Sequence, residues 1–152
     1  MTAEEYTRKA IFQHALLEEL GVKIREMQNT IVTSKLTFPI PIYICESDKY
    51  LFSIKYLKKE YYVKGTIKRA NEVRTKNDYL IIIEFIECKE IKKANGDIIE
   101  IEETMGSPIY MNYLGNMADD ARFTKTILND FNNEIRERII EIIVDKYIEI
   151  LT

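Results

Sequence analysis

The spacing of apolar positions changes twice along the chain and divides it into three parts. In residues 2–28 apolar side chains recur every three or four positions, as on one side of an amphipathic helix. From residue 30 to about 103 the period is two, as in strands with one buried face. From Asn116 onward the spacing is helical again. The order helix, strands, helix predicts an α+β fold.

The N-terminal helix has a start signal of its own. Thr2 and Glu5 form a T-x-x-E capping box, in which each side chain can accept the free backbone N–H of the other residue. Gly21 interrupts the apolar stripe, so the helix either ends at Leu20 or continues at a cost of about 1 kcal/mol relative to alanine. We expect it to continue to about Gln28.

Five segments read as strands of a mostly antiparallel sheet with four to six strands. Pro39 and Pro41 remove N–H donors from the same side of the first segment, which predicts an edge strand. The fourth segment begins with apolar residues on both faces, which is typical of a central strand. Asn95-Gly96 predicts a tight hairpin between the last two segments. The five segments are residues 36–44, 50–56, 61–67, 79–91 and 97–102.

After an expected loop at 104–116, the chain is predicted to be helical to its end. Asn116 is a suitable N-cap, with Asp119 and Asp120 in the first turn, where the helix dipole favours acids. A single straight helix would be about 50 Å long and could not keep a strict four-residue repeat on one surface. We therefore expect two helices, or one that bends at Asn132-Asn133, packing on the sheet. The repeat comprises Phe123, Ile127, Phe131, Ile135, Ile139, Ile143 and Tyr147.

Length and composition fit one soluble domain spanning residues 1–152. The chain is 46% hydrophobic and 31% charged, with 5 glycines and 3 prolines, which excludes collagen-like and intrinsically disordered classes. No uncharged apolar stretch approaches 18 residues and the start lacks a basic region, so we expect no membrane span, no secretory signal and a cytoplasmic location. Ile, Lys, Asn and Tyr are abundant, which predicts a low-GC bacterium, or a phage or mobile element of one, as the source. A phage-encoded chain would be virion-associated.

The sequence contains no recognisable catalytic constellation. His14 is the only histidine and has no metal-ligand spacing around it. Cys45 and Cys88 lie in predicted strands as half-buried thiols without a CxxC pattern. No glycine-rich phosphate loop or nucleophile elbow is present. We therefore predict a non-enzyme without catalytic residues, metal or cofactor.

Charge is segregated along the strands. Residues 47–76 carry nine basic and three acidic side chains, whereas residues 77–116 carry three and eight. Basic residues between aromatic ones suit single-stranded nucleic acid, and residues 61–87 resemble the first hairpin of an OB-type barrel. The other interpretation is that the two blocks form cross-strand ion pairs. The candidate nucleic-acid residues are Lys58, Lys59, Tyr61, Lys64, Lys68 and Arg69.

The C-terminal helix is apolar around most of its circumference. From Ile139 to Leu151 only four residues are charged, so one buried side does not account for the pattern. The excess apolar surface can meet either the N-terminal helix or a second copy of the chain. For the second case the predicted contact residues are Ile139, Ile143, Tyr147 and Ile150.

These observations favour a non-enzymatic binding or assembly module that acts as a homo-oligomer, and the composition favours a structural or accessory protein of a phage or mobile element from a low-GC bacterium. Its expected partners are itself and another protein, with no membrane. The alternative is an OB-like single-stranded nucleic-acid-binding protein, and a third hypothesis is a sensor domain for a small ligand.

Overall fold

The computed structural model describes residues 2–33, 36–69, 79–128 and 136–152. It shows an α+β fold with an N-terminal helix, a seven-stranded antiparallel sheet and a C-terminal helix, which confirms the predicted class with more strands than expected. The elements are α1 (Ala3–Thr33), β1 (Ile42–Cys45), β2 (Phe52–Tyr56), β3 (Lys59–Arg69), β4 (Tyr79–Lys92), β5 (Ile98–Met111), β6 (Met117–Ala118), β7 (Thr126–Leu128) and α2 (Arg136–Leu151).

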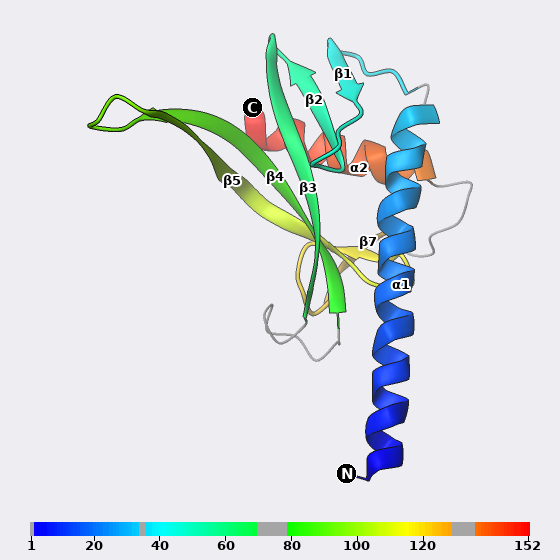
Figure 1. The fold of residues 1–152 in the computed structure, drawn as a ribbon. Helices are drawn as coiled ribbons and strands as arrows, with labels where there is room; N and C mark the ends of the chain where they lie inside the picture. The colour runs from blue at the N-terminus through cyan, green and yellow to red at the C-terminus, as the bar shows by residue number, and fades with distance from the viewer. Residues whose placement is uncertain (1, 34–35, 70–78, 129–135) are drawn as a thin grey trace.

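The capping box that begins α1 is formed as predicted. The Thr2 N–H donates to Glu5 Oε2 at 2.9 Å, and the Glu5 N–H donates to Thr2 Oγ1 at 3.2 Å. The helix continues through Gly21 and extends to Thr33, five residues beyond the expected end. The first buried side chain of the helix is Leu16, and the turns before it project beyond the end of the sheet (Figure 1).

The sheet is a meander in which every strand pairs with its neighbours in the sequence, in the order β1 to β7. β1 is an edge strand, as the prolines predict. The strand begins only at Ile42, however, so Pro39 and Pro41 precede it, and the residues described before Ile42 are not in a strand. β4 lies between β3 and β5, and its first half is buried, which confirms it as a central strand.

One hydrophobic core joins the sheet to both helices. On β4 the side chains of Ile81, Ile83 and Phe85 face this core and are fully buried. From α2, Tyr147 packs its ring edge-on against Phe85 at 4.9 Å, and its hydroxyl donates to the Ile86 carbonyl oxygen at 2.5 Å. α1 contributes Leu20 and its neighbours to the same core.

The prediction of a loop at 104–116 is wrong for its first half, because β5 continues to Met111. The local sequence Gly106-Ser107-Pro108 forms a bulge: Ile83 pairs with Ile109 and Phe85 with Met105, so three residues oppose Glu84 alone. Gly106 has a φ of +62°, and a Cβ there would lie 2.7 Å from Ile150 Cδ1 on α2. Gly106 and Pro108, which suggest a loop in the sequence, thus lie in a bulge, and the strand continues beyond it.

The predicted helix start at Asn116 is also wrong. Residues 117–118 and 126–128 form the short strands β6 and β7, and Asp120 caps a turn by accepting the Thr124 N–H at 3.0 Å. Phe123 and Ile127 are therefore not helical, and α2 begins only at Arg136. The expected break at Asn132-Asn133, like Phe131 and Ile135, lies outside the described residues.

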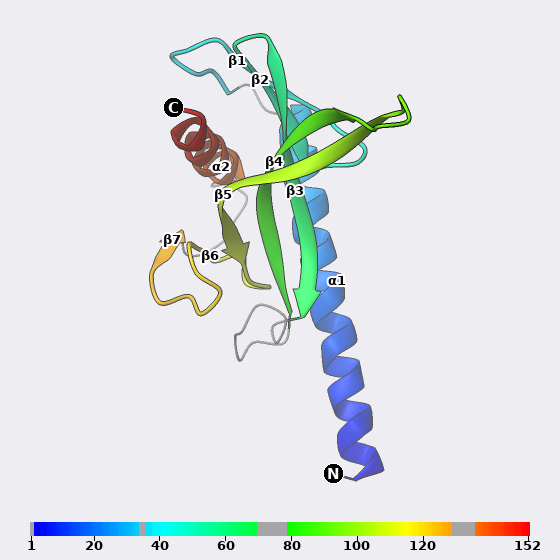
Figure 2. The same cartoon turned by 90° about the vertical axis from the view of Figure 1, so that its left-hand side faces the viewer.

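The outer half of the β4–β5 hairpin projects from the molecule. We call residues 87–103 the arm; it extends beyond the rest of the sheet and away from α2 (Figure 2). The hairpin predicted from Asn95-Gly96 is present, but the central residues of its turn are Ala94 and Asn95: the Gly96 N–H donates to the Lys93 carbonyl at 2.9 Å, and the Lys93 N–H donates to the Asp97 carbonyl at 2.7 Å. Gly96 has a φ of +92°, which the turn requires.

Candidate interaction surfaces

The predicted oligomer residues of α2 lie inside the single chain. Ile139, Ile143 and Tyr147 are fully buried, and Ile150 is half-buried above Gly106. α2 is covered by the sheet on one side and contacts α1 on another, which accounts for its wide apolar surface. Self-association itself stays a prediction, but it requires residues other than these buried ones.

The candidate nucleic-acid residues do not share one face of the sheet. Side chains alternate along β3, so Lys59 and Tyr61 point to the helix-covered face whereas Lys64 and Lys68 point to the opposite one. Tyr61 contacts the Tyr147 ring at 5.7 Å, on the core side. Lys58 is in the β2–β3 turn, at the far end of β3 from Arg69, which lies over the Tyr79 ring.

The basic and acidic blocks instead meet in cross-strand ion pairs. Lys49 and Lys64 each lie 3.1 Å from a carboxylate oxygen of Glu102, and Lys59 pairs with Glu87. All three lysines belong to the basic block and both glutamates to the acidic one. Pairing between neighbouring strands is thus confirmed for Lys59 on β3 and Glu87 on β4, whereas Lys64 pairs with Glu102 across β4 and Lys49 precedes β2.

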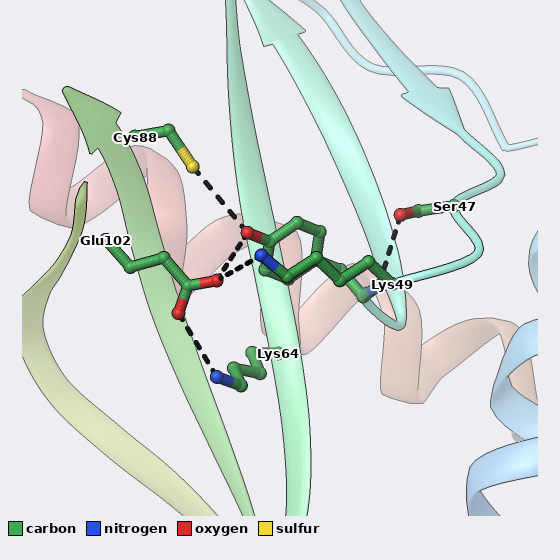
Figure 3. A network of polar contacts seen from close by, with 6 residues as sticks. Ser47, Lys49, Lys64, Cys88 and Glu102 are labelled. Atoms are coloured by element: carbon green, nitrogen blue, oxygen red, sulfur yellow. Dashed lines mark hydrogen bonds and ion pairs between the residues drawn. The ribbon is translucent and has the colours of Figure 1, made fainter. Parts of the chain in front are cut away.

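Glu102 is the centre of a polar network at the base of the arm (Figure 3). In addition to the two lysines, the Tyr50 hydroxyl donates to Glu102 Oε1 at 2.6 Å and lies 3.6 Å from Cys88 Sγ. Tyr50 is buried and tilts against the Tyr62 ring at 4.6 Å. The network joins the segment before β2 to β4 and β5, on the face of the sheet away from the helices.

The network holds each of its groups in one protonation state. The hydrogen bond from Tyr50, helped by Lys49 and Lys64, lowers the pKa of Glu102 to about 2 against partial burial. Burial, with the bond to Glu102, raises the pKa of Tyr50 far above its ordinary value, and burial raises the pKa of the Cys88 thiol. Near neutral pH Glu102 is a carboxylate while Tyr50 and Cys88 are protonated, so the cluster neither exchanges protons nor offers a thiolate. It fixes the arm to the sheet.

Most of the large apolar side chains that are exposed among the described residues lie on three parts of the molecule. One group lies on the projecting turns of α1, a second surrounds the open edge at β1 and the β2–β3 turn, and a third is on the arm, where its two members lie on opposite faces. The members are Tyr6, Ile11 and Phe12; Ile40, Tyr43 and Leu57; and Ile91 and Ile98.

The second group lines a groove of about 640 Å³ at the sheet edge, which we call the edge groove. Leu57, 80% exposed, and Lys58 form the β2–β3 turn with φ values of 50° and 64°. Both are left-handed conformations that favour Asn or Gly and strain other residues. The groove is lined by Ile40, Pro41, Tyr43, Lys55, Tyr56, Leu57 and Lys58.

The arm carries an acidic pair beside an exposed isoleucine. Glu90 and Glu100 lie directly opposite each other across the hairpin, and both are exposed. Like charges in this arrangement destabilise the hairpin unless a cation approaches. Ile98, two residues before Glu100 on the same face, is 65% exposed and lies opposite Lys92. We call Glu90, Glu100 and Ile98 the arm patch.

The remaining sequence candidates lie apart from these surfaces. His14 is exposed on α1, where Nε2 lies 3.1 Å from Glu18 Oε1, and Cys45 is a half-buried free thiol on β1. Within the described ranges no group of three or more His, Cys, Asp or Glu residues could hold a metal ion. No helix there combines the length and apolarity needed to cross a membrane.

Neither the edge groove nor the arm patch could be identified from sequence alone. Both depend on which parts of the strands lie beyond the core, and a period of two shows only which side chains share a face of a strand. The one available signal is Tyr-Leu-Lys-Lys at 56–59, where a two-residue turn lacks the usual Asn or Gly.

No protein-family model matches the chain, and no curated protein or solved structure is significantly similar to it.

Proposed function

We propose that the chain is a non-enzymatic assembly module that acts as a homo-oligomer. The observation that carries this proposal is the grouping of exposed apolar side chains on parts that project from a complete core. Among the described residues twelve large apolar side chains are exposed, and eight of them belong to the three groups on α1, the edge groove and the arm. Such grouped apolar exposure is typical of surfaces that become covered by a partner.

The core supports this interpretation because it does not need these residues. Both helices and the central strands already bury their apolar faces in one cluster, while α1 and the arm continue past it. A projecting helix or hairpin costs conformational entropy that is offset only by its own backbone hydrogen bonds and local ion pairs, not by burial in the core. An assembly would recover it in the interface.

The Glu102 network favours a binding role over a catalytic one. General acid–base catalysis requires a group whose pKa is near the operating pH, and nucleophilic catalysis by cysteine requires a thiolate. The pKa of Glu102 is lowered and those of Tyr50 and Cys88 are raised, so none of the three groups meets these conditions. We therefore assign the network to the attachment of the arm.

Light scattering of the purified chain, recorded with the ratio of absorbance at 260 and 280 nm, tests the proposal. We expect a multiple of 18.0 kDa that grows with protein concentration, without nucleic-acid absorbance. A mass of 18.0 kDa at every concentration would contradict it.

The alternatives from the sequence make different demands on the same measurement. Single-stranded nucleic acid would raise the absorbance ratio, but its candidate residues lie on both faces of β3 and two of them already pair with carboxylates. A small-ligand sensor would leave the mass unchanged. Neither alternative is favoured by a specific contact.

A further inference from the structure

We propose that the copies associate head to tail, with the arm patch of one copy seated in the edge groove of the next. This inference rests on the proposed function, since it names the two surfaces through which the homo-oligomer forms. It follows from three matched properties of the surfaces: charge, apolar content and strain.

The edge groove offers two cations without partners. Lys55 and Lys58 are exposed, and neither forms an ion pair within the part of the chain that the structure describes. Glu60, the cross-strand neighbour of Lys55, accepts a hydrogen bond from the Ser53 hydroxyl at 2.7 Å. No acidic residue lines the groove.

The arm patch offers two carboxylates without a cationic partner, although Glu100 shares a hydrogen bond with the Cys88 thiol. Glu90 and Glu100 form no ion pair with any described residue, unlike Glu102 and Glu103 farther along β5. The arm as a whole has six acidic and three basic side chains. Two lysines placed against the opposed glutamates would relieve the repulsion between the two carboxylates. Complementary charges across an interface also make the contact specific.

The apolar parts also correspond. Ile98 stands beside Glu100 on the arm, and Tyr43 and Leu57 stand beside the two lysines in the groove. Each of the three is at least 65% exposed, so each loses apolar surface to water on docking. An apolar anchor surrounded by complementary charges is the usual composition of an energetically important contact.

The two-residue turn that forms the groove requires left-handed conformations, but it carries residues that adopt them with strain. Leu57 and Lys58 occupy left-handed conformations, yet the Leu57 side chain makes little contact within its own chain. Backbone strain of this kind gathers at functional sites. A leucine at this position is explained if it enters a contact with a partner.

The two surfaces are different and lie apart on one chain, with β3 and the length of the arm between them (Figure 1). A contact between unlike surfaces is heterologous, so each copy has one free arm and one free groove. Such copies form a ring when the rotation closes and a filament when it does not.

Two single substitutions test this geometry. Leu57→Asp disables the groove and Ile98→Asp disables the arm, and each exposed site tolerates a polar residue in the folded monomer. We expect each variant alone to raise the apparent dissociation constant at least about tenfold. An equimolar mixture should form a dimer and stop there, because one arm and one groove remain intact. Sedimentation velocity measures both results.

The matched control is Leu114→Asp in the loop between β5 and β6, since Leu114 is 55% exposed and belongs to none of the three exposed apolar groups. We expect it to leave the oligomer unchanged. Oligomers that persist in the Leu57→Asp and Ile98→Asp variants, or that dissociate with Leu114→Asp, would overturn the head-to-tail contact and leave the proposed function standing. A wild-type monomer would overturn both.

A charge exchange gives an independent readout. Lys55→Glu with Lys58→Glu should dissociate the oligomer, and adding Glu90→Lys with Glu100→Lys to the same chain should restore it. Recovery supports direct pairing of the two patches. Failure to recover in a chain with native circular dichroism would contradict it.

Discussion

The inner and outer halves of the β4–β5 hairpin belong to the same two strands but have different compositions and opposite environments. In the inner half of β4 both faces are apolar, and Ile81, Ile83 and Phe85 are fully buried under the helices. In the outer half the same face of β4 carries Glu87, Lys89 and Ile91, and the hairpin extends away from α2 (Figure 2). The Glu102 network and the bulge at Gly106 lie near the boundary.

The difference shows that a strand pattern reports which side chains share a face but not what covers that face. The inner half stabilises the fold, and we propose that the outer half, together with the edge groove, stabilises an assembly. The two roles are separable by experiment, because substitutions in one half should leave the other role intact.

The largest effect is expected from Phe85→Ala. Removing a fully buried ring that packs on Tyr147 should lower the free energy of unfolding by about 3–5 kcal/mol. Ile91→Ala, farther along the same face of β4, should cost less than about 1 kcal/mol because Ile91 is largely exposed. Urea unfolding of both variants measures the contrast, and equal losses would show that the two halves do not differ.

Gly106→Ala should destabilise the boundary by about 2–4 kcal/mol. The new Cβ would be strained at a φ of +62° and would lie 2.7 Å from Ile150 Cδ1. Gly96→Ala, at a φ of +92° with no atom within 4 Å, isolates the strain and should cost about 1–2 kcal/mol. If Gly96→Ala lowers the thermal unfolding midpoint more than Gly106→Ala does, the claim that α2 packs closely on the bulge is wrong.

Glu102→Gln should cost about 1–2 kcal/mol near neutral pH, because the hydrogen bond from Tyr50 and the two ion pairs lose their charge. The pKa of Glu102 is lower in the folded chain, so its contribution is complete above the ordinary value of 4.5 and disappears as the pH falls through about 2. The difference between wild type and variant should therefore shrink from pH 5 to pH 2.

Denaturant unfolding at several pH values measures that difference. Glu103→Gln is the control, since its pair with Lys89 is about half exposed and should contribute little at any pH. A difference for Glu102→Gln that stays constant with pH would contradict the assignment.

The smallest effect on the fold is an expected gain. Leu57→Asn combined with Lys58→Gly relieves two left-handed conformations and should raise the free energy of unfolding by about 1–2 kcal/mol. The same change removes an apolar and a cationic side chain from the edge groove and should weaken self-association. Calorimetry measures the expected gain in stability, and sedimentation velocity measures the expected loss of self-association. A variant that gains both stability and association would refute the role of the turn.

The sequence predicts those features that depend on neighbours in the chain. The capping box at Thr2 and Glu5, the Asn95-Gly96 turn and the buried alternation of β4 are local, and all three are present. The extension of β5 through Gly106 and Pro108 escaped prediction because the bulge depends on Ile150 of α2, which packs over the glycine.

The candidate site was harder to predict for the same reason. The apolar excess of α2 suggests an interface, but α1 covers part of it, and only the tertiary structure shows that contact. Conversely, the exposure of Ile98 and Leu57 depends on where the sheet stops supporting the hairpin and the turn. Periodicity carries no information about that limit.

Amide hydrogen exchange of the wild-type chain at low and high protein concentration tests the central claim most directly. The account predicts that the outer half of the hairpin, around Ile98–Glu102, and the β2–β3 turn become more protected together as concentration rises, while the inner half of β4 does not change. Protection that grows only on the first turns of α1, or on no segment while the mass increases, would contradict the assignment of assembly to the arm and the edge groove.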